Sequence, residues 1–192
     1  MNMLIAQFKN AFPWIKYKLF KSFCMPLYGM QLWNLSGREI NSFYTAWRKC
    51  ICRLFNIPSR THNVLLNIIC EDFPITMQLH NRFLKFIHSV ITNDNYCIQL
   101  CGKLVMNGSH STACDNLNYI CNSYTIDKYQ LPKLKISGLI NRIRKSYIDK
   151  ISVEDLSKSS LVSDLLYYRE FKHTSFLSTD EIDVMLLSVC TE

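Results

Sequence analysis

Three cysteines and one histidine in the middle of the chain have the types and spacing of a metal site. They follow the pattern Cys97-x3-Cys101-x8-His110-x3-Cys114. Three thiolates and an imidazole are a suitable ligand set for tetrahedral zinc. The residues between these cysteines are apolar, however, and free cysteine is a common small core residue. We therefore favour core packing over zinc and expect neither a metal nor another cofactor.

No other pattern in the chain predicts catalysis. The five glycines form neither a Gly-x-Gly-x-x-Gly turn nor a phosphate loop, and no nucleophile elbow or zinc-protease signature occurs. The acidic pairs Glu71-Asp72 and Glu154-Asp155 fall in helical or loop contexts. Paired carboxylates for phosphoryl transfer would need the tip of a strand hairpin. We interpret both pairs as helix-end or surface charges and expect no enzymatic activity.

Basic residues are the remaining candidates for a functional site. The chain has 22 Lys and Arg against 15 Asp and Glu, and residues 1–60 contain nine basic residues and one acid. Residues 151–192 contain three basic and eight acidic residues. This asymmetry fits a polyanion partner at the basic end, although an uneven solvated surface explains the composition equally well. The candidates are Lys16, Lys18, Lys21, Arg38, Lys49 and Arg53, with a weaker patch at Arg142, Arg144 and Lys145.

The N-terminus and the cysteine count bear on location. Residues 1–10 lack a basic leader region, and their apolar run stops at Gln7 and Lys9, unlike a signal peptide. No uncharged apolar run approaches the ~18–20 residues that a membrane helix needs. The nine cysteines are odd in number, which favours reduced thiols. We expect an intracellular protein, cytoplasmic or nuclear, that is not secreted and does not bind membranes.

The elements that carry these residues are predicted to be helices. In the clearest case, Ser36-Gly-Arg-Glu39 has the form of a capping box, and apolar residues recur from Ile40 to Phe55 on one face. Arg38, Lys49 and Arg53 then fall on the opposite face, and Pro58 ends the helix. We predict an all-α, irregular helical bundle with further helices over 62–70, 75–92, 95–106, 112–123, 137–149, 161–170 and 178–189. Loops are expected at 107–111, 123–132 and 157–160.

The stretch SFCMPLYGMQLW, residues 22–33, is predicted to continue a helix that begins at Pro13. Proline is well suited to a first helical position, whereas Pro26 in the interior would kink the axis. Gly29 has no side chain and would let another backbone approach closely. The stretch is therefore predicted to be a bent, buried helix.

The segment KLFKSFCMPLYGMQLWNLSGREINSFYTAWRKCICRLFNIPSRTHNVLL, residues 18–66, resembles the region after the catalytic palm in reverse transcriptases of non-LTR (LINE-type) retrotransposons. In that family a helix with the pattern Ser-x-x-x-Pro-x-x-Tyr-Gly-x-x-x-Trp precedes a helix with Trp-Arg-Lys and a Pro-x-x-Thr turn. The matching positions here are Ser22, Pro26, Tyr28-Gly29, Trp33, Trp47-Arg48-Lys49, Pro58 and Thr61, with slightly different spacing around Pro26. Weaker likeness extends the match to about Leu4–Thr191.

The resemblance implies a thumb-like helical region at 1–92, which would hold a template–primer duplex, and a C-terminal helical extension at 93–192. By analogy, the candidate phosphate contacts are Lys16, Lys18, Lys21, Arg38, Arg48, Lys49 and Arg53. Tyr28, Gly29 and Trp33 would mainly pack the first thumb helix, and Pro26, Trp47 and Pro58 complete the structural motif. Some family members carry a Cys-Cys-His-Cys cluster here, but the spacing around His110 differs by one residue on each side.

The catalytic motif of the family, Tyr or Phe-x-Asp-Asp, does not occur in this sequence. The resemblance therefore implies a non-catalytic fragment with residual affinity for an RNA or DNA duplex. One alternative is a helical protein-interaction module, or a remnant without nucleic-acid activity, whose exposed apolar surface would self-associate. Another is that the chain is one piece of a longer, active polymerase.

Overall fold

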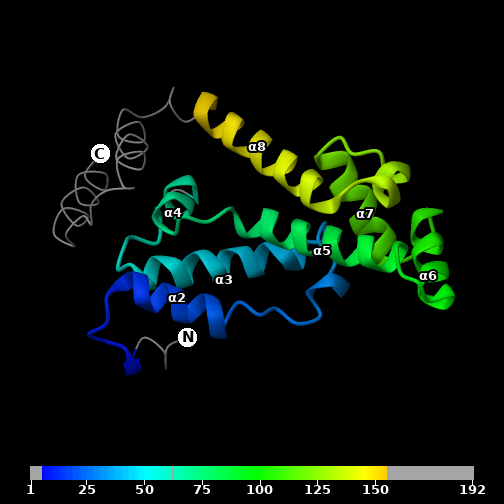
Figure 1. Cartoon of the computed structure of the whole chain (residues 1–192). Helices are drawn as coiled ribbons and strands as arrows, with labels where there is room; N and C mark the ends of the chain where they lie inside the picture. Colours follow the sequence, from blue (N-terminus) through cyan, green and yellow to red (C-terminus); the bar gives the residue numbers. More distant parts are fainter. Residues whose placement is uncertain (1–5, 62, 155–192) are drawn as a thin grey trace.

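The computed structural model describes residues 6–61 and 63–154 (Figure 1). All regular elements in this part are helical, which confirms the all-α prediction. The helices predicted at 161–170 and 178–189 lie outside the described residues. The α-helices are α2 (Pro13–Phe23), α3 (Arg38–Leu54), α4 (Asn63–Ile69), α5 (Ile75–Ile91), α6 (Tyr96–Met106), α7 (Thr112–Ser123) and α8 (Ile136–Glu154), and the 3₁₀ helices are η1 (Met30–Leu32) and η2 (Lys128–Lys133).

The long helix α5 is the centre of the bundle. It packs against α6, α8, η1 and η2, while α3 packs against α2 and α4 (Figure 1). Phe83 and Leu84 of α5 are completely buried. The hydrophobic core is continuous from Tyr17 in α2 to Ile143 in α8. The predicted boundary between 1–92 and 93–192 falls in the turn between α5 and α6, and buried residues on both sides of it belong to this one core.

Helix α3 has the two faces that its sequence predicts. Trp47 and Ile51 are buried, whereas Lys49 and Arg53 are exposed. The predicted capping box is wrong, because Gly37 occupies the N-cap position and no side chain caps the helix. The Ser36 hydroxyl instead donates a hydrogen bond to the side-chain oxygen of Asn34 at 2.9 Å. With Gly37 at the N-cap, Ser36 lies one position outside the helix start, so its oxygen is not at the position from which a cap accepts from the first-turn amides.

The predicted bent helix over 22–33 is also wrong. Helix α2 ends at Phe23, and the Cys24 amide closes its last turn onto the Phe20 carbonyl at 2.8 Å. Residues 25–27 are irregular, because Pro26 disfavours a helical conformation at the preceding residue and has no amide hydrogen to donate. Proline therefore terminates this helix and does not kink it.

The residues after Pro26 form a turn, whereas we predicted that they pack within a helix. Gly29 has φ = +73°, and no atom lies within 4 Å of the position that its Cβ would take. Gly29 is therefore required for a left-handed turn and not for a close backbone approach. Tyr28 is 91 % exposed and does not pack against the helix, contrary to expectation. Trp33 is partly exposed and meets Phe43 edge-on, with ring centroids 5.4 Å apart.

The close approach of backbones occurs at Gly102 in α6. A Cβ at this residue would lie 3.0 Å from the Cα of Ile91 in α5. A backbone atom cannot move aside as the end of a side chain can, so the α5–α6 packing requires glycine here.

We expect Gly102→Val to lower the free energy of unfolding by about 1–2 kcal/mol through overpacking. Gly138→Ala in α8 is the matched control, because nothing lies within 4 Å of its Cβ position. That substitution should be neutral or stabilise by up to ~1 kcal/mol, since alanine favours the helix. Chemical denaturation followed by circular dichroism measures both, and a Gly102→Val protein as stable as the parent would contradict the packing argument.

Candidate nucleic-acid interface

The solvent face of α3 carries three cations. Arg38, Lys49 and Arg53 lie within about 60° of each other around the helix axis, on the side away from the buried stripe. Within residues 6–61 and 63–154, none of these side chains forms an ion pair or a hydrogen bond. Arg38 begins the helix and Arg53 lies in its last turn, about 22 Å away at 1.5 Å per residue. Lys49 and Arg53 thus form a pair, and Arg38 would contact a separate part of a ligand.

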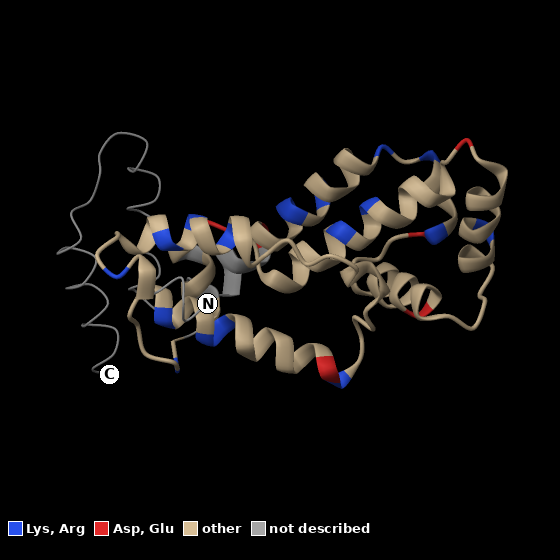
Figure 2. Ribbon diagram, turned by 90° about the horizontal axis from the view of Figure 1, so that it is seen from below, with Lys and Arg blue, Asp and Glu red and all other residues tan. Residues whose placement is uncertain are grey.

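Helix α2 brings further lysines to the end of the molecule where α3 ends (Figure 2). The Lys16 Nζ donates to the Lys9 carbonyl at 2.9 Å, and the Lys18 Nζ lies 5.3 Å from the centroid of the Trp14 ring. Residues 1–38 contain no Asp or Glu. Helix α2 itself has three lysines and no acid, so its end of the molecule, the basic end, is a candidate contact for polyanions.

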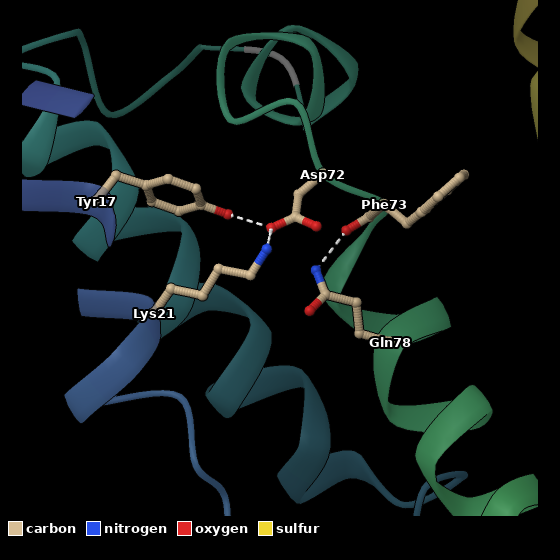
Figure 3. A network of polar contacts seen from close by, with 5 residues as sticks. All are labelled: Tyr17, Lys21, Asp72, Phe73 and Gln78. Atoms are coloured by element: carbon tan, nitrogen blue, oxygen red, sulfur yellow. Dashed lines mark hydrogen bonds and ion pairs between the residues drawn. The ribbon is translucent and has the colours of Figure 1, made fainter. Parts of the chain in front are cut away.

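Lys21 is the exception in α2, because it pairs with an acid (Figure 3). Its ammonium group contacts Asp72 Oδ2, and the Tyr17 hydroxyl donates to the same oxygen at 2.7 Å. Burial, reinforced by this hydrogen bond, raises the pKa of Tyr17 far above its usual value. Beside them, the Gln78 side chain donates to the Phe73 carbonyl at 2.7 Å. Asp72 therefore ties α2 to the turn before α5 and neutralises one lysine, a role beyond the helix-end or surface charge that we predicted for this acidic pair.

Arg48 is also engaged within the protein. Its Nη2 donates to the Ser59 carbonyl, and its Nε is buried without a hydrogen-bond partner. The guanidinium therefore fixes the turn that follows α3. A phosphate would have to compete with Ser59 for this side chain, so Arg48 is less available than Lys49 or Arg53.

The four residues of the candidate zinc set are not brought together in one site, although Cys97 and Cys101 share a face of α6. Cys97, Cys101 and His110 are exposed, whereas Cys114 is buried and its sulfur accepts a hydrogen bond from the side-chain Nδ2 of Asn118 at 3.4 Å. In the described part of the chain, no three His, Cys, Asp or Glu side chains are arranged to hold a metal ion. Core packing is correct for Cys114 and wrong for Cys97 and Cys101.

Asn116 is a structurally important residue that no motif in the sequence marks. It is completely buried in α7, where its Oδ1 accepts from the Leu35 amide at 2.8 Å and its Nδ2 donates to the Trp33 carbonyl at 2.6 Å. The side chain thus binds the extended segment that leads into α3. In the sequence, Asn116 is only a polar residue next to the buried positions of an amphipathic helix. Its position in the helix does not identify the residues to which it bonds.

A second buried polar cluster surrounds His80 of α5. The His80 Nδ1 lies 3.0 Å from the Tyr124 hydroxyl, and the Tyr119 ring meets the imidazole edge-on. Burial lowers the pKa of His80 to about 4 and raises the pKa of Tyr124 to about 12. Both groups are neutral near pH 7, so this cluster provides packing and a hydrogen bond and adds no charge to the basic end.

These features define an all-helical chain with a basic end. Within the described residues, no helix combines the length and the apolar character that crossing a bilayer requires. Comparisons with known protein families, curated proteins and solved structures find no match to this chain.

Proposed function

We propose that this chain is a non-catalytic, thumb-like part of a non-LTR retrotransposon reverse transcriptase that binds the backbone of an RNA or DNA duplex. The main support is the pair Lys49 and Arg53, exposed on one face of α3 without protein partners among the described residues. The lysines of α2 lie at the same end of the molecule (Figure 2). The Trp47-Arg48-Lys49 motif and the Pro58-x-x-Thr61 turn support the origin of the chain.

Such binding is electrostatic and independent of base sequence. Each lysine or arginine that neutralises a phosphate releases condensed counterions, so affinity falls steeply as salt rises. The exposed cations without partners should contribute most, because they lose no protein contact on binding. Lys21 and Arg48 should contribute less, since Asp72 and Ser59 already hold them.

The test is the binding of a short DNA duplex, and of the RNA–DNA hybrid of the same sequence, measured by fluorescence anisotropy at several salt concentrations. Combining Lys49→Gln with Arg53→Gln should reduce the log–log salt slope by about 0.9 per lost phosphate contact. Lys103→Gln, on the distant helix α6, is the matched control and should leave the slope unchanged. Absence of binding at low salt would refute the proposal.

Asp72→Asn should have the opposite effect on duplex binding from the Lys49→Gln and Arg53→Gln substitutions. It removes a negative charge and releases Lys21 from its ion pair, so duplex affinity should rise and the salt slope should steepen. The Tyr17 hydroxyl can still bond the amide oxygen, which limits the loss of structure. Circular dichroism checks the fold, and an affinity that falls in a folded variant would mean that Asp72 and Lys21 lie outside the interface.

A protein-interaction module is the second candidate function. Phe12, Phe23, Tyr28 and Leu32 are 62, 75, 91 and 74 % exposed, so large apolar side chains are available for contact with another protein. Self-association in light scattering, reduced by Phe23→Ser and accompanied by no affinity for either duplex at low salt, would favour this function over nucleic-acid binding.

A further inference from the structure

Two exposed thiols lie one turn apart on α6. Cys97 and Cys101 are both free and exposed. Residues four positions apart in a helix share a face, with Cβ atoms about 5–6 Å apart. The chain therefore presents two sulfur atoms together on a rigid element.

Packing does not explain the two cysteines. Cysteine is among the residue types that are most often buried. Helix α6 packs on α5 through a different side, which contains Gly102 and Met106. Cys52, Cys70, Cys114 and Cys121 are buried and fit the usual pattern. Cys24 is exposed on its own, whereas Cys97 and Cys101 are exposed together on one face of one helix.

A disulfide between the two does not explain them either. A disulfide requires Cβ atoms about 3.5–4.5 Å apart, which is closer than positions i and i+4 of an intact helix allow. As long as α6 is folded, the pair remains a dithiol.

We propose that Cys97 and Cys101 form a two-thiolate site for a soft monovalent metal ion, Cu(I). Thiolates select soft ions such as Cu(I), whereas structural zinc needs four ligands and this face offers two. On binding, both thiols release a proton and two Cu–S bonds form, which leaves a complex with one negative charge. With metal–sulfur bonds near ~2.3 Å, the sulfurs of a two-coordinate ion are about 4.6 Å apart, within reach of the two side chains.

The surroundings of the pair suit this complex. Cys97 lies in the first turn of α6, where the helix dipole stabilises negative charge. Leu100 and Leu104, exposed at 42 and 54 %, lie beside the thiols on the same side of α6, and their apolar side chains lower the local polarity. Helix α6 is at the opposite end of the bundle from α2 (Figure 1), so the site is separate from the basic end.

The test uses the full chain, reduced and handled without oxygen, in competition with a chromophoric Cu(I) chelator such as bicinchoninate. We expect one tightly bound ion per chain, and an affinity at least ~100-fold weaker in Cys97→Ser and in Cys101→Ser. Cys24→Ser removes another exposed thiol and should change nothing.

A spacing variant separates a specific site from general thiol binding. Cys101→Ser combined with Lys103→Cys keeps the number of exposed thiols but places them on different sides of α6, and it should bind as weakly as Cys101→Ser alone. Circular dichroism confirms that each variant is folded. A parent chain that takes no ion from the chelator, or a spacing variant that binds like the parent, would overturn the proposal.

Discussion

Replacing Asn116 with alanine is expected to lower the free energy of unfolding by about 3 kcal/mol. The substitution leaves the Leu35 amide and the Trp33 carbonyl without their partners. An unsatisfied buried polar group costs about 1–3 kcal/mol, and the loss of the side chain adds a cavity at a site with no solvent exposure. Urea denaturation followed by circular dichroism measures the effect.

The control for Asn116 is Asn122→Ala in the same helix. Asn122 is exposed, so its replacement should change stability by less than ~0.5 kcal/mol. Asn116→Leu tests the role of polarity, because it restores most of the side-chain volume without restoring either hydrogen bond. A leucine variant as stable as the parent would show that Asn116 only fills space.

The two hydrogen bonds of Asn116 also affect the position of the candidate phosphate-binding residues in α3. Asn116 holds the segment at Trp33–Leu35, and α3 begins three residues after Leu35, at Arg38. The direction of α3, and with it the position of Lys49 and Arg53, therefore depends on a contact between residues more than 80 positions apart in the sequence. The salt slope for duplex binding should be measured only on variants that retain this contact.

Periodicity was sufficient to predict most helices, because one apolar stripe on a helix can be read from the sequence alone. The helix predicted at 75–92 is observed at Ile75–Ile91, and the one at 112–123 at Thr112–Ser123. The loop predicted at 123–132 overlaps η2 (Lys128–Lys133), a short 3₁₀ helix that has no long apolar period to reveal it. Residues 22–33 are apolar enough for a helix, but Pro26 and Gly29 impose backbone conformations that override composition.

In the candidate nucleic-acid interface, the exposure of side chains could be predicted from the sequence, whereas contacts between distant residues could not. The exposure of Arg38, Lys49 and Arg53 follows from their positions relative to the apolar stripe of α3, and it is observed. The pairing of Lys21 with Asp72 joins residues 51 positions apart, and no pattern in the sequence indicates it. Which cations are available for phosphate is therefore a property of tertiary packing.

Acid is expected to destabilise the fold through His80. Burial holds the pKa of His80 near 4, below the value of about 6.5 in an unfolded chain. As the pH falls below 6.5 the unfolded state takes up this proton first, so the stabilisation is complete above pH 6.5 and is lost as the pH falls to about 4. The shift corresponds to about 3 kcal/mol at 1.36 kcal/mol per pKa unit.

The contribution of His80 to the pH dependence of the free energy of unfolding can be measured with a substitution. His80→Phe keeps a ring in the same space but cannot be protonated, so its free energy of unfolding should change by about 3 kcal/mol less between pH 7 and pH 4 than that of the parent. His110→Asn, at an exposed histidine, should follow the parent. Because the imidazole also contacts Tyr124, the phenylalanine variant starts from lower stability at pH 7, and only the slope against pH reports the proton. Equal slopes for the parent and His80→Phe would show that His80 is protonated as easily in the folded state as in the unfolded chain.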